Sequence, residues 1–96
     1  MPDINEIRKI VVPIAYAYGV KRLYLFGSYA KGTARGKSDV DLLVEKGKPM
    51  SLLNLFGMRQ LFQEALSLSV DLVTTAGIAD DFRKEIAGTE ILLYEE

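Results

Sequence analysis

Residues 27–44 read GSYAKGTARGKSDVDLLV, and this stretch decides how the rest of the chain is interpreted. The apolar run just before it predicts a buried strand over residues 22–26. Gly27 and Ser28 interrupt that run, and Ser28 can cap a short helix that reaches residue 31. The alternation Asp-Val-Asp-Leu, followed by an apolar run, predicts a strand over residues 39–45 whose first half is exposed to solvent on one face. The stretch therefore predicts two strands joined by a turn, a short helix and a glycine-containing loop.

Asp39 and Asp41 lie two residues apart on the second predicted strand. Because side chains alternate along a strand, both carboxylates point to the same face, with Cα atoms roughly 6.6 Å apart. Like charges at this spacing repel unless a cation lies between them, and magnesium prefers oxygen ligands. The pair therefore indicates a metal site, and two solvated surface acids are the alternative.

Asp71 lies between Val70 and Leu72 in a third predicted strand, residues 69–74. A carboxylate buried in an apolar strand is costly without a partner, and a metal shared with Asp39 and Asp41 would supply one. The alternative is a lone acid on an exposed face of the sheet.

The turn at Gly27-Ser28 is a candidate phosphate site. A helix N-terminus presents free N–H groups, glycine allows a ligand to approach the backbone, and the serine hydroxyl adds a hydrogen bond. A plain glycine turn with a serine cap is the alternative. The P-loop motif is absent, because Thr33 follows Gly32 where that motif needs lysine.

The remaining pattern alternates helices with strands. Asp3 and Gly19 fit the start and stop of a helix over residues 3–18, in which Pro13 predicts a kink or a break. Further segments are a helix over residues 51–66, a helix over 78–87 and an extended piece over 90–94. The core arc of the 51–66 helix is predicted to comprise Leu55, Met58, Leu61, Phe62, Ala65 and Leu66. We expect an α/β (α+β) fold, with a small mixed sheet of three to four strands flanked by helices in one domain, 1–96.

Composition excludes several kinds of chemistry. The 96 residues include neither cysteine nor histidine, which rules out disulfides, thiolate nucleophiles and histidine-bound metals. The net charge of -1 argues against a protein that coats nucleic acid. Because neither a signal peptide nor a membrane-spanning run is visible, we expect a cytoplasmic protein without a membrane partner. A domain this short buries only a modest fraction of its surface, so self-association or binding to a partner chain is compatible with its size.

Taken together, the motifs resemble one known family. Phe26-Gly27-Ser28, ten intervening residues, Asp39-Val40-Asp41-Leu42 and then Val70-Asp71-Leu72 are similar to the signature of the polymerase-beta-like nucleotidyltransferase superfamily, especially its minimal one-domain members. The resemblance implies that Gly27 and Ser28 hold a nucleoside triphosphate. It also implies that Asp39 and Asp41 bind two magnesium ions, with manganese as the alternative metal. Asp71 would bind one ion and favour deprotonation of an acceptor hydroxyl, while Lys31, Arg35 and Lys37 could steady the phosphates.

The same resemblance implies an acceptor. Minimal members resemble antitoxins that transfer AMP from ATP to a tyrosine of an all-helical HEPN-type toxin. The alternatives are transfer to RNA or a small molecule, and a binding module that acts by occlusion alone. Leu52, Leu53 and Phe56 lie off the predicted core arc of the 51–66 helix, and three large apolar groups on an exposed face indicate an interface.

Overall fold

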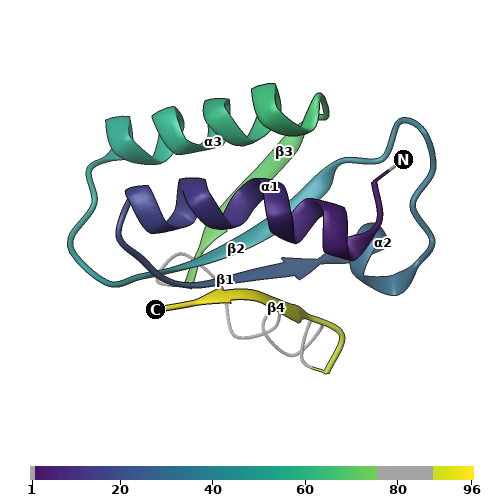
Figure 1. The fold of residues 1–96 in the computed structure, drawn as a ribbon, viewed down its shortest axis with the longest axis horizontal. Coiled ribbons are helices and arrows are strands. Elements are labelled where there is room, and N and C mark those ends of the chain that lie inside the picture. Colours follow the sequence, from purple (N-terminus) through teal and green to yellow (C-terminus); the bar gives the residue numbers. More distant parts are fainter. Residues whose placement is uncertain (1, 76–87) are drawn as a thin grey trace.

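The structure is a computed structural model that describes residues 2–75 and 88–96. Its elements follow the order α1 (Ile4–Ala17), β1 (Val20–Phe26), α2 (Gly27–Lys31), β2 (Val40–Lys46), α3 (Leu52–Leu66), β3 (Val70–Thr74) and β4 (Ile91–Glu95), as Figure 1 shows. The helix predicted over residues 78–87 lies outside the described residues. In the described part, no helix has the length and apolar character needed to cross a bilayer.

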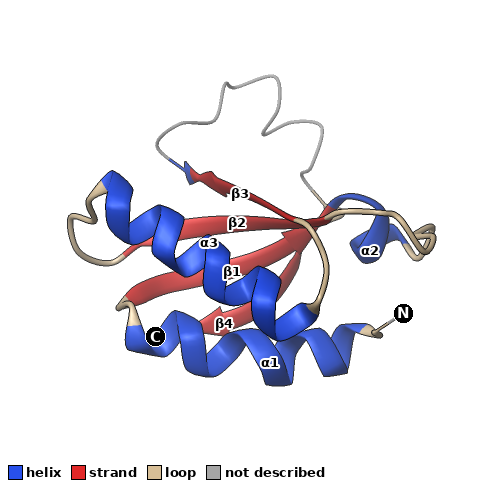
Figure 2. Ribbon diagram, turned by 90° about the horizontal axis from the view of Figure 1, so that it is seen from above, coloured by secondary structure: helices blue, strands red, loops and turns tan. Residues whose placement is uncertain are grey.

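The four strands form one mixed sheet in the order β3-β2-β1-β4. β1 pairs antiparallel with both β2 and β4, whereas β2 and β3 run parallel. α1 and α3 pack on the same face of this sheet, and the core lies between them and the strands (Figure 2). The expected small mixed sheet with flanking helices is confirmed. The face turned away from α1 and α3, called the opposite face below, carries the candidate site.

Helix α1 begins as predicted but is not broken by its proline. The Asp3 side chain accepts a hydrogen bond of 2.8 Å from the backbone N–H of Glu6, and Gly19 follows the helix with a φ of 71°. Pro13 lies inside the continuous helix on its exposed side. Of the two predicted outcomes, a kink or a break, the break is absent. One lost N–H is tolerated there, because core residues on both sides of Pro13 hold the helix against the sheet.

Helix α3 buries a narrower stripe than the sequence predicted. Ser51 caps it by accepting a bond of 3.1 Å from the N–H of Asn54. The predicted core positions Leu61 and Ala65 are exposed, whereas the buried side chains are Met58, Phe62 and Leu66. The prediction failed at those two positions because apolar residues surround this helix almost completely, so their spacing does not define a face. The predicted exposure of the other apolar side is confirmed: the exposed fractions are 65% for Leu52, 82% for Leu53 and 56% for Phe56.

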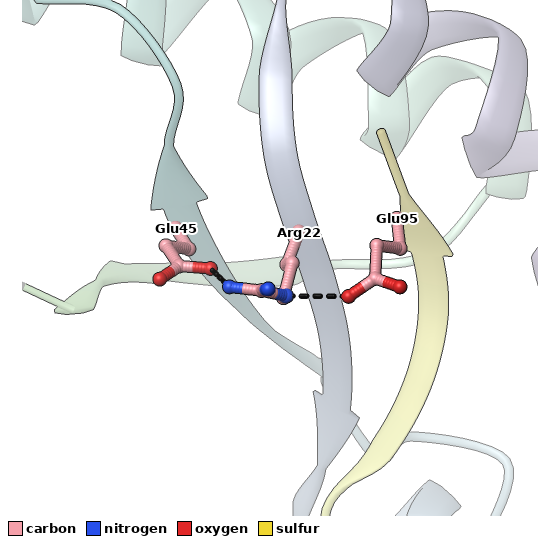
Figure 3. A network of polar contacts seen from close by, with 3 residues as sticks. All are labelled: Arg22, Glu45 and Glu95. Carbon is pink, nitrogen blue, oxygen red and sulfur yellow. Dashed lines mark hydrogen bonds and ion pairs between the residues drawn. The ribbon is translucent and has the colours of Figure 1, made fainter.

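An ion-pair network joins three strands at the far end of β1 from Phe26. Arg22 of β1 contacts Glu45 of β2 and Glu95 of β4, each at 2.6 Å (Figure 3). Arg22 is also the register partner of both glutamates. Cross-strand pairs of opposite charge favour one register over its neighbours. The network thus helps to fix β2 and β4 relative to β1, away from the end of β1 where Phe26 pairs with Asp41.

Candidate active site

Two carboxylates meet at the start of the parallel strands. Asp41 of β2 is the direct register partner of Asp71 of β3. Their neighbours Val40, Leu42 and Val70 are fully buried in the core, so alternation turns both acids to the opposite face. The sheet therefore brings together two residues that lie 30 positions apart in the chain (71 − 41).

Asp71 is exposed, and the predicted burial of its carboxylate was wrong. Val70 and Leu72 are apolar because they face the helices, whereas Asp71 alternates to the other side of an edge strand. Asp71 lies beside Asp41, whose carboxylate is a like charge, so the shared metal remains a prediction. An exposed Asp71 leaves its carboxylate accessible to a ligand or to a reacting group.

Asp39 flanks this pair. It immediately precedes β2, which begins at Val40, and its side chain is exposed. Its charge contributes to the raised pKa of Asp41, so its carboxylate acts on the same site. Within residues 2–75 and 88–96, no three acidic side chains are already gathered as a metal cluster. The fold thus brings Asp41 and Asp71 together directly and leaves Asp39 beside them.

Burial is the main reason why the pKa of Asp41 rises from 3.8 to about 6, and the charge of Asp71 is the next cause. A hydrogen bond between the two side chains and the charge of Asp39 add to the shift. Neighbouring carboxylates that raise a pKa in this way are ones that a divalent cation would stabilise in their ionised form. The donor set contains oxygen only, which fits magnesium or manganese.

Gly27 closes the site from the end of β1. It has a φ of 74°, and a Cβ at this position would overlap Oδ2 of Asp41 and lie 3.0 Å from its Cγ. The sequence motif indicated phosphate binding by Gly27 but gave no sign of this packing, because the contact depends on the pairing of Phe26 with Asp41. Glycine here lets the carboxylate of Asp41 lie against the backbone of the turn.

The predicted capping role of Ser28 is wrong. Helix α2 already includes Gly27, its N-cap is Phe26, and no side chain caps it. The extended backbone of Phe26 leads directly into the turn at Gly27, so Ser28 falls inside the first turn. Ser28 directly follows Gly27, the residue that packs against Asp41.

An open hollow of about 490 Å³ adjoins the two acids. It is lined by Phe26, Asp41, Phe56, Arg59, Asp71, Leu72 and Val73. Arg59 was not among the residues predicted from the sequence, because only the packing of α3 against β3 brings it to the hollow. The basic residues Lys31, Arg35 and Lys37 are exposed on α2 and the following loop and do not line this hollow.

A mixed sheet with paired acids beside a glycine turn is compatible with the class of proteins that catalyse metal-dependent phosphoryl transfer. The family model described as "Nucleotidyltransferase domain" matches residues 4–93, and the chain belongs to this family. The resemblance drawn from residues 27–44 and from Asp71 is thereby confirmed at the level of the family.

Relatives of known name agree with this assignment. The candidate protein adenylyltransferase MJ0435 of Methanocaldococcus jannaschii is 43% identical over 72 residues, which are 75% of this chain and 77% of that protein. The protein adenylyltransferase MntA of Thermococcus cleftensis is 35% identical over 90 residues, covering 90% and 91% of the two chains.

Solved structures show the same fold. A candidate minimal nucleotidyltransferase has a TM-score of 0.81 and 30% identity, and the match covers 94% of this chain and 95% of that one. A toxin–antitoxin structure with AMP-PNP also has a TM-score of 0.81, covering 93% and 73%. At 22% identity this second likeness establishes the fold alone.

Proposed function

We propose that this chain is a protein adenylyltransferase that transfers AMP from ATP to a hydroxyl of a partner protein and thereby acts as an antitoxin. The observation that carries the proposal is the register pairing of Asp41 with Asp71 beside Gly27. The choice of protein as acceptor rests on relatives that are named protein adenylyltransferases. A cytoplasmic location is part of the proposal, because the proposed donor ATP is abundant there.

Asp39, Asp41 and Asp71 would hold magnesium, with two ions in the full site. Bound divalent ions stabilise charge on the attacking and leaving oxygens of a phosphoryl transfer. The carboxylate of Asp41 is half-buried and fixed against Gly27, so it provides the rigid part of the site. Gly27 and Ser28 would hold the triphosphate, and Lys31 and Arg35 would approach it from α2 and the loop.

Asp71 is the acid that an acceptor can reach. Both acids line the hollow, but the Asp71 side chain is exposed, whereas Asp41 is half-buried and packs against Gly27. In the proposed reaction the acceptor oxygen bonds to the α-phosphorus, pyrophosphate leaves, and Asp71 favours loss of the hydroxyl proton. No covalent intermediate on the protein is needed, because positioning and charge neutralisation suffice for this chemistry.

The proposed partner is a helical HEPN-type toxin whose tyrosine receives AMP. One neighbouring structure is described as a tri-AMPylated HEPN toxin in complex with its MNT antitoxin. On this chain, the exposed apolar side chains of Leu52 and Leu53 lie on the first turn of α3, and Phe56 both follows them and lines the hollow. A partner that covered this surface would therefore lie beside Asp41 and Asp71.

Incubation with ATP labelled at the α-phosphate and with lysate of the source cells tests the proposal. Label is expected on a protein band and absent from RNA; label confined to RNA or to small molecules would contradict it. The Asp39→Ala/Asp41→Ala variant should abolish labelling. The matched control is Glu45→Ala, which removes a carboxylate from the same strand and face but lies in the Arg22 network.

A toxicity assay separates enzymatic from passive neutralisation. If the Asp39→Ala/Asp41→Ala variant binds the partner without neutralising it, transfer is the basis of the antitoxin effect. If the folded variant neutralises the partner as well as the wild type, occlusion alone is sufficient and the enzymatic proposal fails.

A further inference from the structure

The strand that carries Asp71 is held at its outer edge by two side chains of α3. The backbone N–H of Val40 donates to the carbonyl of Ser69 at 2.9 Å, so the peptide groups of Ser69 and Asp71 face β2. Those of Val70 consequently point away from β2. β3 is an edge strand, so no strand among the described residues pairs with this side of Val70.

Both backbone groups of Val70 have side-chain partners instead. Nε of Arg59 donates to the carbonyl of Val70 at 2.8 Å, and the N–H of Val70 donates to Oε1 of Gln63 at 3.1 Å. Arg59 and Gln63 lie four residues apart on α3, hence on the same side of the helix. Figure 1 shows α3 leading by a short turn into β3, which lies beside it. The two bonds form a clamp, defined here as Arg59 and Gln63 on the peptide groups of Val70.

The clamp acts on the residue next to Asp71. Burial of the Val70 side chain selects which face of the sheet Asp71 occupies, because a slip by one residue would turn Asp71 into the core. Burial alone leaves a short edge strand free to shift along or away from β2. Two directional bonds to one residue restrict that freedom, and the bond from the arginine is charge-assisted.

We propose that Arg59 and Gln63 are positioning residues for nucleotidyl transfer, which set the carboxylate of Asp71 against that of Asp41 by holding Val70. The inference rests on the proposed function of the site. Groups that orient metal-binding or reacting residues commonly change affinity or activity about 10- to 100-fold when they are removed. The clamp is assigned to the geometry of Asp71. Arg59 also lines the hollow, whereas Gln63 does not, so Gln63→Leu tests the positioning role apart from substrate contact.

The test combines hydrogen exchange with kinetics on the full chain. Gln63→Leu removes the acceptor for the Val70 amide, and Arg59→Met removes the donor while keeping an apolar stem. Gln63→Glu retains an acceptor and Arg59→Lys retains a charged donor. Two control variants carry the same substitutions at residues that do not contact Val70. Gln60→Leu loses a bond to Glu64 on the same helix, and Arg8→Met loses a bond of 3.3 Å to the carbonyl of Leu92 on the other edge strand.

In Gln63→Leu, exchange of the Val70 amide should accelerate by at least about tenfold, whereas Gln60→Leu should leave it unchanged. In Gln63→Leu and Arg59→Met, kcat for transfer should fall about tenfold or more, with KM for ATP changed less than about twofold. The magnesium concentration for half-maximal rate should rise in the same variants. Gln63→Glu and Arg59→Lys should recover most of kcat, and Arg8→Met should retain it.

Three results would overturn the assignment. Val70 exchange that is unchanged in Gln63→Leu would show that the clamp is absent in solution. Faster exchange with an unchanged kcat in folded variants would show that the clamp does not position Asp71. A wild-type chain that labels no acceptor would contradict the proposed function and this inference together. An active wild type whose Gln63→Leu and Arg59→Met variants keep the wild-type kcat would contradict the inference alone.

Discussion

The carboxylate of Asp41 occupies the space that a side chain at Gly27 would need. A Cβ added to Gly27 would overlap Oδ2 of Asp41 and lie 3.3 Å from its Cβ. The glycine of the turn and the acid of β2 are therefore one structural unit, although 14 positions separate them in the chain (41 − 27). This contact couples the conformation of the turn after β1 to the position of the acid on β2.

Replacement of Gly27 by alanine should damage both stability and activity. A non-glycine residue at positive φ and a forced shift of Asp41 together should lower the free energy of unfolding by about 2–4 kcal/mol. Displacement of the carboxylate should reduce transfer at least about 100-fold. Urea unfolding and labelled-ATP transfer would measure the two effects.

Gly32→Ala is the matched control for that change. Gly32 has a similar φ of 75°, but nothing lies within 4 Å of a Cβ placed there. The backbone strain alone should cost about 1–2 kcal/mol and leave transfer near the wild-type rate. Equal losses of activity in the two variants would contradict the role assigned to the contact between Gly27 and Asp41.

The stability of the metal-free protein should fall as pH rises from 4 to 6. Burial and the charge of Asp71 raise the pKa of Asp41 from 3.8 to about 6 in the folded chain. The folded state then binds more protons than the unfolded state between these two pKa values. The stability that protonated Asp41 contributes is therefore fully present below the unfolded-state pKa of 3.8 and is lost as pH rises through about 6. Its size should be at most about 1–2 kcal/mol, because water screens a half-buried carboxylate.

Denaturant unfolding in a chelator, at pH 4.5 and at pH 7.5, would measure this contribution as the difference between wild type and Asp41→Asn. The wild type should lose more stability than the variant on going to the higher pH. Added magnesium should stabilise the wild type at pH 7.5 and leave the variant unaffected. A variant with the same pH dependence and the same magnesium response as the wild type would rule out this account of Asp41.

Phe56→Asp should weaken association with the partner without unfolding the chain. The Phe56 side chain is 56% exposed, so its replacement removes little core packing, while a charge would be buried on binding. Thermal unfolding, partner pull-down and light scattering would measure the effects, with Tyr16→Asp as the control, because Tyr16 is an exposed aromatic residue of α1 (74% exposed) outside the proposed interface. Unchanged mass by light scattering together with an unchanged pull-down would refute the interface.

Local sequence signals predicted most elements within one or two residues. Asp3 and Ser51 accept the capping bonds that their positions indicated, and Gly19 follows α1. Predictions failed where a local signal was ambiguous. Leu61 was assigned to the core because α3 offers apolar residues on several sides, and Pro13 does not break a helix whose other residues are anchored in the core.

The site depends on contacts that no local pattern contains. Asp39, Asp41, Asp71 and Gly27 could be named from their motifs, but the parallel register that sets Asp41 beside Asp71 is a property of the assembled sheet. Asp71 is exposed because it lies on an edge strand. The apolar residues on either side of it had indicated a buried position instead. The bonds from Arg59 and Gln63 to Val70 likewise appear only once α3 packs beside β3.

Calorimetric titration of magnesium-ATP into the wild type and into Asp39→Ala/Asp41→Ala tests the central claim most directly. The account predicts binding by the wild type that requires magnesium and disappears in the variant, with circular dichroism showing that the variant is folded. Equal binding by the folded variant, or binding that is indifferent to magnesium, would contradict the claim that these carboxylates form the nucleotide site.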